Sequence, residues 1–193
     1  MGCDIHGAVE VREYPDSGGW WNRYLDLSGF VGRNYEMFAI LFGVRNYSAW
    51  TPVAADRGFP DDADYSTKEE YQHWEGDAHS ASWVTWAELE AVDENSETPG
   101  YDGWVHVYAP NESGTGELEE VMSFGGSSEL SDADMRALDA GETITRGKQV
   151  YRRQKATFRQ SIGSDWKRLF AHMELLAKDF GDENVRAVVW FDN

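Results

Sequence analysis

Only one cysteine, Cys3, is present among the 193 residues of the chain, which excludes an intrachain disulfide. Long apolar runs are missing as well: residues 37–44 come nearest to one and are far too short to span a bilayer. No signal peptide is recognisable at the amino terminus. We therefore expect a soluble intracellular protein that has no contact with a membrane.

Positive charge is also scarce. Lys and Arg together number 17 against 35 Asp and Glu, which gives a formal net charge of −18. Such a charge argues against a general attraction to nucleic acid. It suits a halophilic host, where an acidic surface stays soluble, and a DNA-mimicking inhibitor is the alternative. Because the acids are spread along the chain and not gathered in one block, we prefer the explanation by solubility.

The amino-terminal segment has the alternating pattern of a β-strand. Apolar Ile5 and Val9 alternate with Asp4, His6 and Glu10. Side chains two residues apart on a strand point to the same face, so the three polar residues should project together. An Asp-x-His pair on a strand presents a carboxylate and an imidazole to one metal ion. The alternative is a half-solvated strand with an ordinary polar face.

A second Asp-x-His pair, Asp77 and His79, lies in residues 45–83, which we expect to form a long loop with little regular structure. Long loops of this kind in compact domains are often binding or active-site loops. If the two pairs meet in space, they provide two carboxylates and two imidazoles, enough for one or two divalent ions. Otherwise His79 caps a turn and Asp77 is a helix cap or a solvated acid.

These pairs suggest a divalent-metal-dependent phosphoester hydrolase that acts on a nucleotide or nucleic acid. The expected metal ligands are Asp4, His6, Asp77 and His79. The ion would lower the pKa of a bound water, so that hydroxide attacks phosphorus near neutral pH. Glu10 is expected as a further ligand or general base, and Arg45 or Arg57 as the group that neutralises phosphate charge.

The rest of the pattern predicts an α+β fold. Three segments have the spacing of helices with one apolar face: residues 36–44, 85–92 and 164–180. Residues 185–191 are nearly continuously apolar, as in a central strand. We expect a single domain over residues 1–193, with a mixed or antiparallel sheet that contains both chain termini and has helices packed on it. Asp192 or Asn193 should then lie near the amino-terminal acids.

Residues 94–160 are expected to be an insertion that holds an acidic loop, a hairpin and a basic strip. The strip comprises Arg146, Arg152, Arg153, Lys155 and Arg159, among other cations of residues 146–168. In so acidic a chain, a local cationic strip could hold a phosphate or dock a nucleic acid. The alternative is that the strip neutralises acidic loops through ordinary surface ion pairs.

Several segments together form a recognisable set: residues 1–6, 33–35, 38–46, 57–60, 77–83 and 185–193. With these segments the chain resembles a family of small, largely uncharacterised proteins of tailed phages and prophages that begin Met-Gly-Cys-Asp-Ile-His. The resemblance does not extend over residues 94–160. The resemblance implies a viral accessory protein in a host cytoplasm, and it implies no particular activity.

This resemblance leaves a second function open beside the hydrolase. The chain would then be a non-enzymatic anti-defence protein or inhibitor. It would bind a host defence protein through an acidic face, or sequester a signalling nucleotide between Arg and Trp side chains.

Overall fold

The computed structural model describes residues 2–74, 76–111, 115–125 and 130–193. The chain divides into two compact units. The first unit comprises residues 1–46, 50–96 and 158–193, and the second comprises residues 47–49 and 97–157. Each unit is built on a four-stranded antiparallel sheet, so the predicted α+β class is confirmed.

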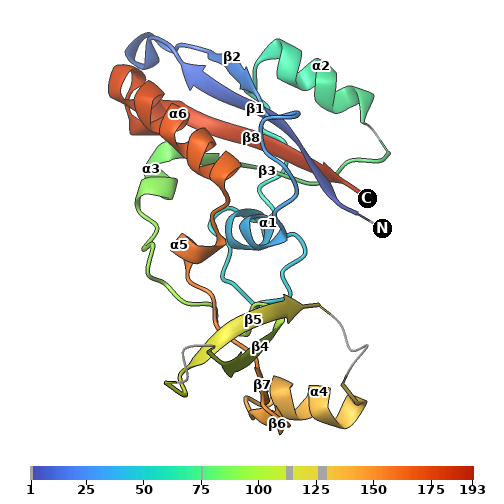
Figure 1. Ribbon diagram of the computed structural model, residues 1–193. Helices are drawn as coiled ribbons and strands as arrows, with labels where there is room; N and C mark the ends of the chain where they lie inside the picture. Colours follow the sequence, from blue (N-terminus) through green and yellow to red (C-terminus); the bar gives the residue numbers. More distant parts are fainter. Residues whose placement is uncertain (1, 75, 112–114, 126–129) are drawn as a thin grey trace. The chain divides into compact units, whose positions relative to one another are not determined.

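The sheet of the first unit has the strand order β2-β1-β8-β3. Its strands are β1 (Asp4–Arg12), β2 (Trp21–Asp26), β3 (His79–Thr85) and β8 (Val185–Asp192). The first and the last strand are neighbours, paired antiparallel from Asp4 opposite Asp192 to Val11 opposite Val185. Both chain ends therefore lie in one sheet, as the sequence predicts, and Figure 1 shows them side by side.

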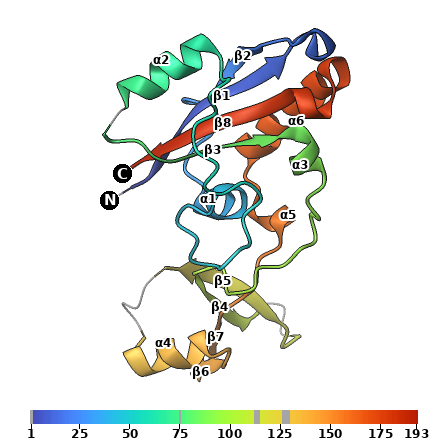
Figure 2. The ribbon, with the colours of Figure 1, turned by 180° about the vertical axis from the view of Figure 1, so that it is seen from behind.

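The alternation predicted for the first strand is confirmed. Ile5 and Val9 of β1 belong to the hydrophobic core together with Val189 and Phe191 of β8. We call this side of the sheet the core face. His6 and Glu10 point to the other side, towards helix α2 (Tyr65–His73), and we call that side the α2 face. Figures 1 and 2 show α1 and α2 on opposite sides of the sheet.

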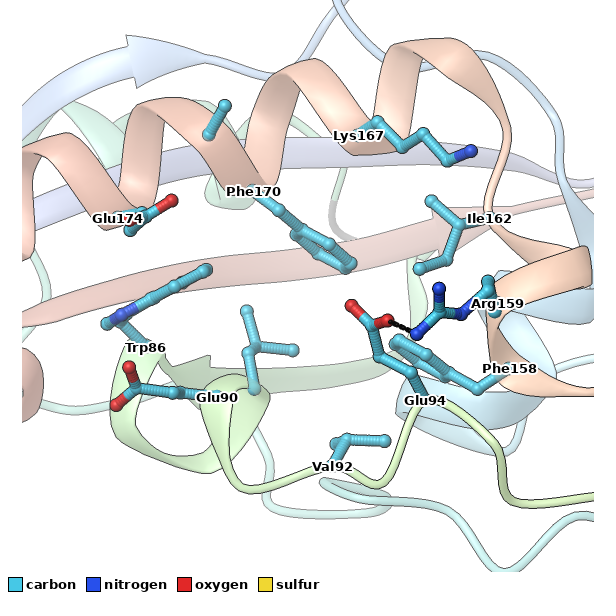
Figure 3. A pocket seen from close by; sticks show the side chains of 12 residues that line it. Trp86, Glu90, Val92, Glu94, Phe158, Arg159, Ile162, Lys167, Phe170 and Glu174 are labelled. Atoms are coloured by element: carbon cyan, nitrogen blue, oxygen red, sulfur yellow. Dashed lines mark ion pairs between the residues drawn. The ribbon is translucent and has the colours of Figure 1, made fainter.

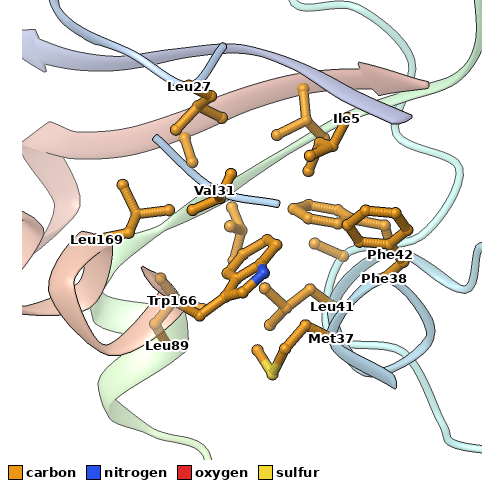
Figure 4. Close-up of a cluster of buried hydrophobic side chains, with 14 of the residues drawn as sticks. Ile5, Leu27, Val31, Met37, Phe38, Leu41, Phe42, Leu89, Trp166 and Leu169 are labelled. Carbon is orange, nitrogen blue, oxygen red and sulfur yellow. The ribbon is translucent and has the colours of Figure 1, made fainter. Parts of the chain in front are cut away.

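Helices α1 (Tyr35–Phe42), α3 (Trp86–Glu90) and α6 (Ser164–Phe180) contribute to the core face. Six consecutive residues of α1, from Met37 to Phe42, are buried. The buried face of α6 consists of Trp166, Leu169, Met173, Leu176 and Ala177. Figure 4 shows Trp166 and Leu169 of α6 in one cluster with Met37, Phe38, Leu41 and Phe42 of α1.

The ends of these helices follow local sequence rules. The side chain of Asn34 accepts a hydrogen bond from the backbone of Met37 and caps α1, while Gly43 ends it with a positive φ of 74°. Thr85 and Glu88 form the predicted capping box at the start of α3.

Residues 45–83 contain more regular structure than the sequence predicts. Helix α2 lies inside this segment, and β3 already begins at His79. The prediction was wrong here because α2 has no apolar stripe: its sequence is polar, and Thr67 is its one buried residue. Its start is fixed instead by Asp64, whose side chain accepts a hydrogen bond from the backbone of Ser66.

The second unit contains the strands β4 (Val105–Pro110), β5 (Leu118–Phe124), β6 (Ile144–Arg146) and β7 (Gln149–Arg152), in the order β5-β4-β7-β6. Helix α4 (Asp132–Asp139) contributes Leu138 to a small core with Val105, Val107, Leu130 and Tyr151. The hairpin expected within residues 94–160 is formed by β4 and β5. Apart from residues 47–49, the unit lies within residues 94–160, over which the resemblance does not extend.

Three short helical segments complete the described structure. They are a 3-10 turn at Pro15–Ser17, helix α5 (Phe158–Ser161) and a 3-10 turn at Asp182–Asn184. None of the helices in the described part of the chain combines the length and apolarity that a membrane span requires.

Candidate functional site

The two chain ends meet at one end of the first sheet, where β1 begins and β8 ends. We call this place the terminal edge and define it by Asp4, His6, Asp192 and Asn193. The backbone N–H of Asp4 donates a hydrogen bond to Asp192 Oδ1 at 3.2 Å. The expectation that Asp192 lies near the amino-terminal acids is therefore confirmed.

The two Asp-x-His pairs do not converge. His6 lies opposite Trp190, whereas His79 lies opposite Phe191. Because successive residues of a strand point to opposite faces, the two imidazoles project from opposite faces of the sheet. Their ring contacts agree: His6 lies 4.0 Å from the ring of Trp74 on the α2 face, and His79 lies 6.1 Å from Phe191 on the core face.

The expected four-ligand metal site is therefore not assembled. Asp77 is exposed in the turn before β3 and does not join Asp4 and His6. Within residues 2–74, 76–111, 115–125 and 130–193, no three His, Cys, Asp or Glu side chains are grouped so that they could hold a metal ion. The reason is the register of β3 on β8, which decides the face on which His79 lies.

On the α2 face, Asp4 and His6 have separate partners. Arg33 binds Asp4 through two hydrogen bonds of 2.5 and 2.6 Å. These hydrogen bonds lower the pKa of Asp4 below its ordinary value. His6 Nε2 lies 3.6 Å from Asp192 Oδ1, too far for a hydrogen bond, and is buried without a hydrogen-bond partner.

Glu10 is fully buried, although the sequence suggested a catalytic carboxylate. Its Oε2 accepts hydrogen bonds from Arg186 Nε and Nη2 at 3.0 and 2.9 Å, and its Oε1 accepts one from the backbone of Asp64. A carboxylate held in this way joins the sheet to the segment before α2. The role of general base or metal ligand has no support in this arrangement.

Arg57 also lies on the α2 face and is bound by Glu88, with N–O distances of 2.9 and 2.5 Å. Its guanidinium lies 4.7 Å from the ring of Trp83. Burial acts to raise the pKa of Glu88, but the hydrogen bonds from Arg57 and Thr85 outweigh it, so the pKa lies below its ordinary value. Arg57 therefore supports the fold at this position.

Arg45 lies at the terminal edge beside a cavity of about 520 Å³, which we call the Arg45 hollow. The hollow is lined by Gly43, Val44, Arg45, His79, Ser80 and Asn193. Arg45 and Ser80 both have left-handed backbone conformations, with φ of 55° and 51°. Such conformations are strained for residues other than glycine and are found preferentially at binding and catalytic sites.

The side chain of Arg45 is oriented by its neighbours. Its Nη2 donates a hydrogen bond to Asn193 Oδ1 at 2.8 Å, and its guanidinium lies 5.9 Å from the ring of Tyr35. It also hydrogen-bonds the thiol of Cys3, which opposes the rise in the pKa of that thiol caused by burial. Cys3, Tyr35 and Asn193 thus hold this cation at the hollow.

Ser80 and Asn193 were missed as site residues by the sequence analysis. A Ser that follows a histidine carries no signal of its positive φ. Asn193 becomes a site residue only because β8 ends beside β3.

The basic strip is largely neutralised. Three of its arginines form ion pairs with a carboxylate of the same unit, at 2.5 to 2.9 Å: Arg146 with Asp134, Arg153 with Asp139, and Arg159 with Glu94. The guanidinium of Arg152 lies 3.7 Å from the ring of Tyr108, and Lys155 is exposed. This pattern matches the alternative of local ion pairs better than a free cationic surface.

His106 in the second unit is held by two carboxylates. Its Nε2 lies 2.7 Å from Asp102 and its Nδ1 lies 2.9 Å from Glu120. Burial acts to lower its pKa, but the two carboxylates outweigh it and raise the pKa above the ordinary value. With both ring nitrogens engaged, this imidazole does not act as a base or metal ligand here.

A larger cavity of about 560 Å³ lies between α3, α5 and α6 of the first unit. Its walls are mostly apolar and include Trp86, Phe158 and Phe170, as Figure 3 shows. The ion pair of Arg159 with Glu94 lies at its rim. The apolar lining suits a phosphate poorly, because a buried anion requires hydrogen-bond donors.

Comparisons with known protein families, with curated proteins and with solved structures found no match to this chain. The resemblance to phage and prophage proteins therefore stays a prediction.

Proposed function

We propose that this is a phage-encoded accessory protein that acts in the host cytoplasm and binds a nucleotide through its phosphate at the terminal edge. The observation that carries the proposal is the Arg45 hollow, where two residues in strained backbone conformations lie beside His79 and Asn193. Binding of a host defence protein stays an alternative prediction.

The chemistry of the hollow suits an anion. A guanidinium binds phosphate oxygens bidentately, and the amide of Asn193 provides a further hydrogen-bond donor. The hydroxyl of Ser80 lies 3.0 Å from His79 Nδ1, so these two groups act as one pair beside the anion. The strained backbone costs on the order of 1–3 kcal/mol at each residue. A protein keeps such strain when function requires the position of these side chains. The net charge of −18 opposes binding only weakly in a salt-rich host, because salt screens charges beyond about 10 Å or less.

Calorimetric titration with mono-, di- and cyclic nucleotides and with inorganic phosphate tests this proposal. Arg45→Asn removes the cation but tolerates the left-handed backbone, and should weaken binding at least tenfold. Ser80→Gly relaxes the backbone and removes a hydroxyl, and should weaken binding without loss of stability. Arg168→Gln is the matched control, since Arg168 is exposed on α6. If none of these ligands binds the wild-type protein, the proposal fails.

Metal-dependent hydrolysis of the bound ligand is a second candidate. It is favoured by the position of Asp4, His6 and Asp192 on one face, with Asp192 Oδ1 3.6 Å from His6 Nε2. Two carboxylates and an imidazole suit a divalent ion, but in the described residues these three are not grouped for one. Asp4 would have to leave Arg33, and the three side chains would have to converge.

The two histidines test this candidate. Metal content, and turnover of a generic phosphodiester with and without chelator, should be lost in His6→Ala. In His79→Ala the metal content should be kept, whereas turnover should fall because a group of the Arg45 hollow is removed. If His6→Ala retains both metal content and turnover, the proposed hydrolase activity is wrong.

A further inference from the structure

The interface between α2 and the sheet is built from aromatic and polar side chains. Trp74, directly after α2, lies 4.0 Å from His6, and Tyr71 lies 5.4 Å from Trp190. Tyr71 also stacks on Phe59 at 4.2 Å with an interplanar angle of 7°. The floor of this interface therefore consists of flat rings instead of interdigitating aliphatic groups.

Three polar atoms at this interface are buried without a hydrogen-bond partner. They are Nε1 of Trp190, Oγ1 of Thr67 and Nε2 of His6. Trp190 and Thr67 are both fully buried. A buried donor or acceptor left unsatisfied costs about 1–3 kcal/mol. Three such atoms, one on α2 and two on the sheet that it covers, point to a polar occupant.

Helix α2 is attached to the sheet by few contacts. Its one buried residue is Thr67, whereas α1 buries six consecutive residues. Beside the ring contacts, its attachments include the ion pair of Arg23 with Glu70. Opening of α2 exposes the ring of Trp190, but α2 itself contributes one buried residue against six from α1 and five from α6. We therefore expect this helix to open at a lower free energy than α1 or α6.

We propose that α2 covers a binding slot for a nucleobase. When α2 lifts, the base enters between Trp74 of the cover and the rings of His6 and Trp190. Bases combine flat π-faces with alternating donors and acceptors on their edges, which matches stacked rings that carry unsatisfied polar atoms. The indole N–H of Trp190 donates a hydrogen bond to an acceptor of the base. The hydroxyl of Thr67 forms a hydrogen bond with another polar atom on the edge of the base.

The proposal does not depend on the Arg45 hollow, because a nucleoside has no phosphate. The probes are adenosine, guanosine, cytidine and uridine, titrated by calorimetry and followed by hydrogen exchange of the α2 amides. At least one nucleoside should bind and slow the exchange of residues 65–73. A single-stranded oligonucleotide, titrated in parallel, tests whether the slot binds a base within a nucleic-acid strand.

Two variants remove the polar atoms separately. Trp190→Phe keeps a ring and removes the indole N–H, and should weaken nucleoside binding at least tenfold. Thr67→Val keeps the shape and removes the hydroxyl, so it should weaken binding while the unfolding midpoint stays equal or rises. Trp20→Ala is the control and should keep the wild-type affinity, because Trp20 is 76% exposed.

Ordered water is the competing explanation for the unsatisfied atoms. It predicts that no nucleoside binds at millimolar concentration, which overturns the proposal. Binding that is unchanged in Thr67→Val and Trp190→Phe overturns it too, and so does binding of the oligonucleotide alone. If Trp190→Phe does not fold, Thr67→Val decides.

Discussion

The two faces of the first sheet differ in what they bury. The core face packs Val9, Val189 and Phe191 against α1 and α6 in one apolar cluster. The α2 face carries a buried ion pair of Glu10 with Arg186 and a layer of rings around Trp190. Buried polar atoms without a hydrogen-bond partner lie on both faces: Nε1 of Trp190 and Nε2 of His6 on the α2 face, and Nε1 of Trp166 and Nε2 of His79 on the core face. The difference between the faces is therefore the buried ion pair and the ring layer. We infer that the core face supplies stability and that the α2 face and the terminal edge supply function.

One strand supplies both faces. In β8, Ala187 and Val189 point into the core, while Arg186 and Trp190 point towards α2. A shift of the register by one residue would exchange the two sets and place a guanidinium in the core. The buried ion pair therefore helps to define the register as well as the attachment of the segment before α2.

The largest effect is expected from breaking this ion pair. Arg186→Met leaves Glu10 fully buried without its cation, which should lower the free energy of unfolding by about 3–5 kcal/mol. Urea denaturation measures the loss. The double variant Arg186→Met with Glu10→Leu removes both charges and should recover a large part of it. A loss below about 1 kcal/mol in Arg186→Met would contradict the stabilising role of this ion pair.

A cavity in the core face should have a slightly smaller effect. Leu169 of α6 is 1% exposed, so Leu169→Ala should lower the free energy of unfolding by about 2–5 kcal/mol. The matched control is Leu175→Ala on the same helix, because Leu175 is 61% exposed and its change should stay within about 0.5 kcal/mol. Equal losses in both variants would contradict the assignment of stability to the core face.

The ion pair of Arg57 with Glu88 on the α2 face should give a smaller, pH-dependent effect. The pKa of Glu88 is lowered in the folded state, so its stabilising contribution is present above the ordinary value of 4.5 and disappears as the pH falls through the folded pKa. Glu88→Gln should cost about 1 kcal/mol at pH 7, and the difference between the two proteins should shrink as the pH falls below 4.5 and through the folded pKa of Glu88. A difference that does not shrink in this range would mean that the loss comes from packing.

The sequence predicts the core face well and the α2 face poorly, for a physical reason. Local periodicity and capping reveal β1, the α3 capping box and the apolar stripe of α6, because these depend on residues close together in the chain. The burial of Glu10 depends on Arg186, which is 176 positions away. The face of His79 depends on strand pairing, and α2 has no apolar stripe at all.

The smallest effects are expected from two helix caps that compare the faces directly. Asn34 caps α1 by accepting from Met37, and Asp64 caps α2 by accepting from Ser66. Loss of such a cap costs about 1 kcal/mol of helix stability. Asn34→Ala should lower the global free energy of unfolding by that amount, because α1 cannot leave the core alone.

Asp64→Ala should change global unfolding by only a few tenths of a kcal/mol. The α2 amides should instead exchange about fivefold faster, because α2 opens locally while the sheet stays folded. Hydrogen exchange under native conditions, together with urea denaturation, separates the two outcomes. If Asn34→Ala and Asp64→Ala lower the global free energy of unfolding equally, α2 belongs to the same cooperative unit as α1. In that case α2 does not open separately from the sheet, and the proposed cover is wrong.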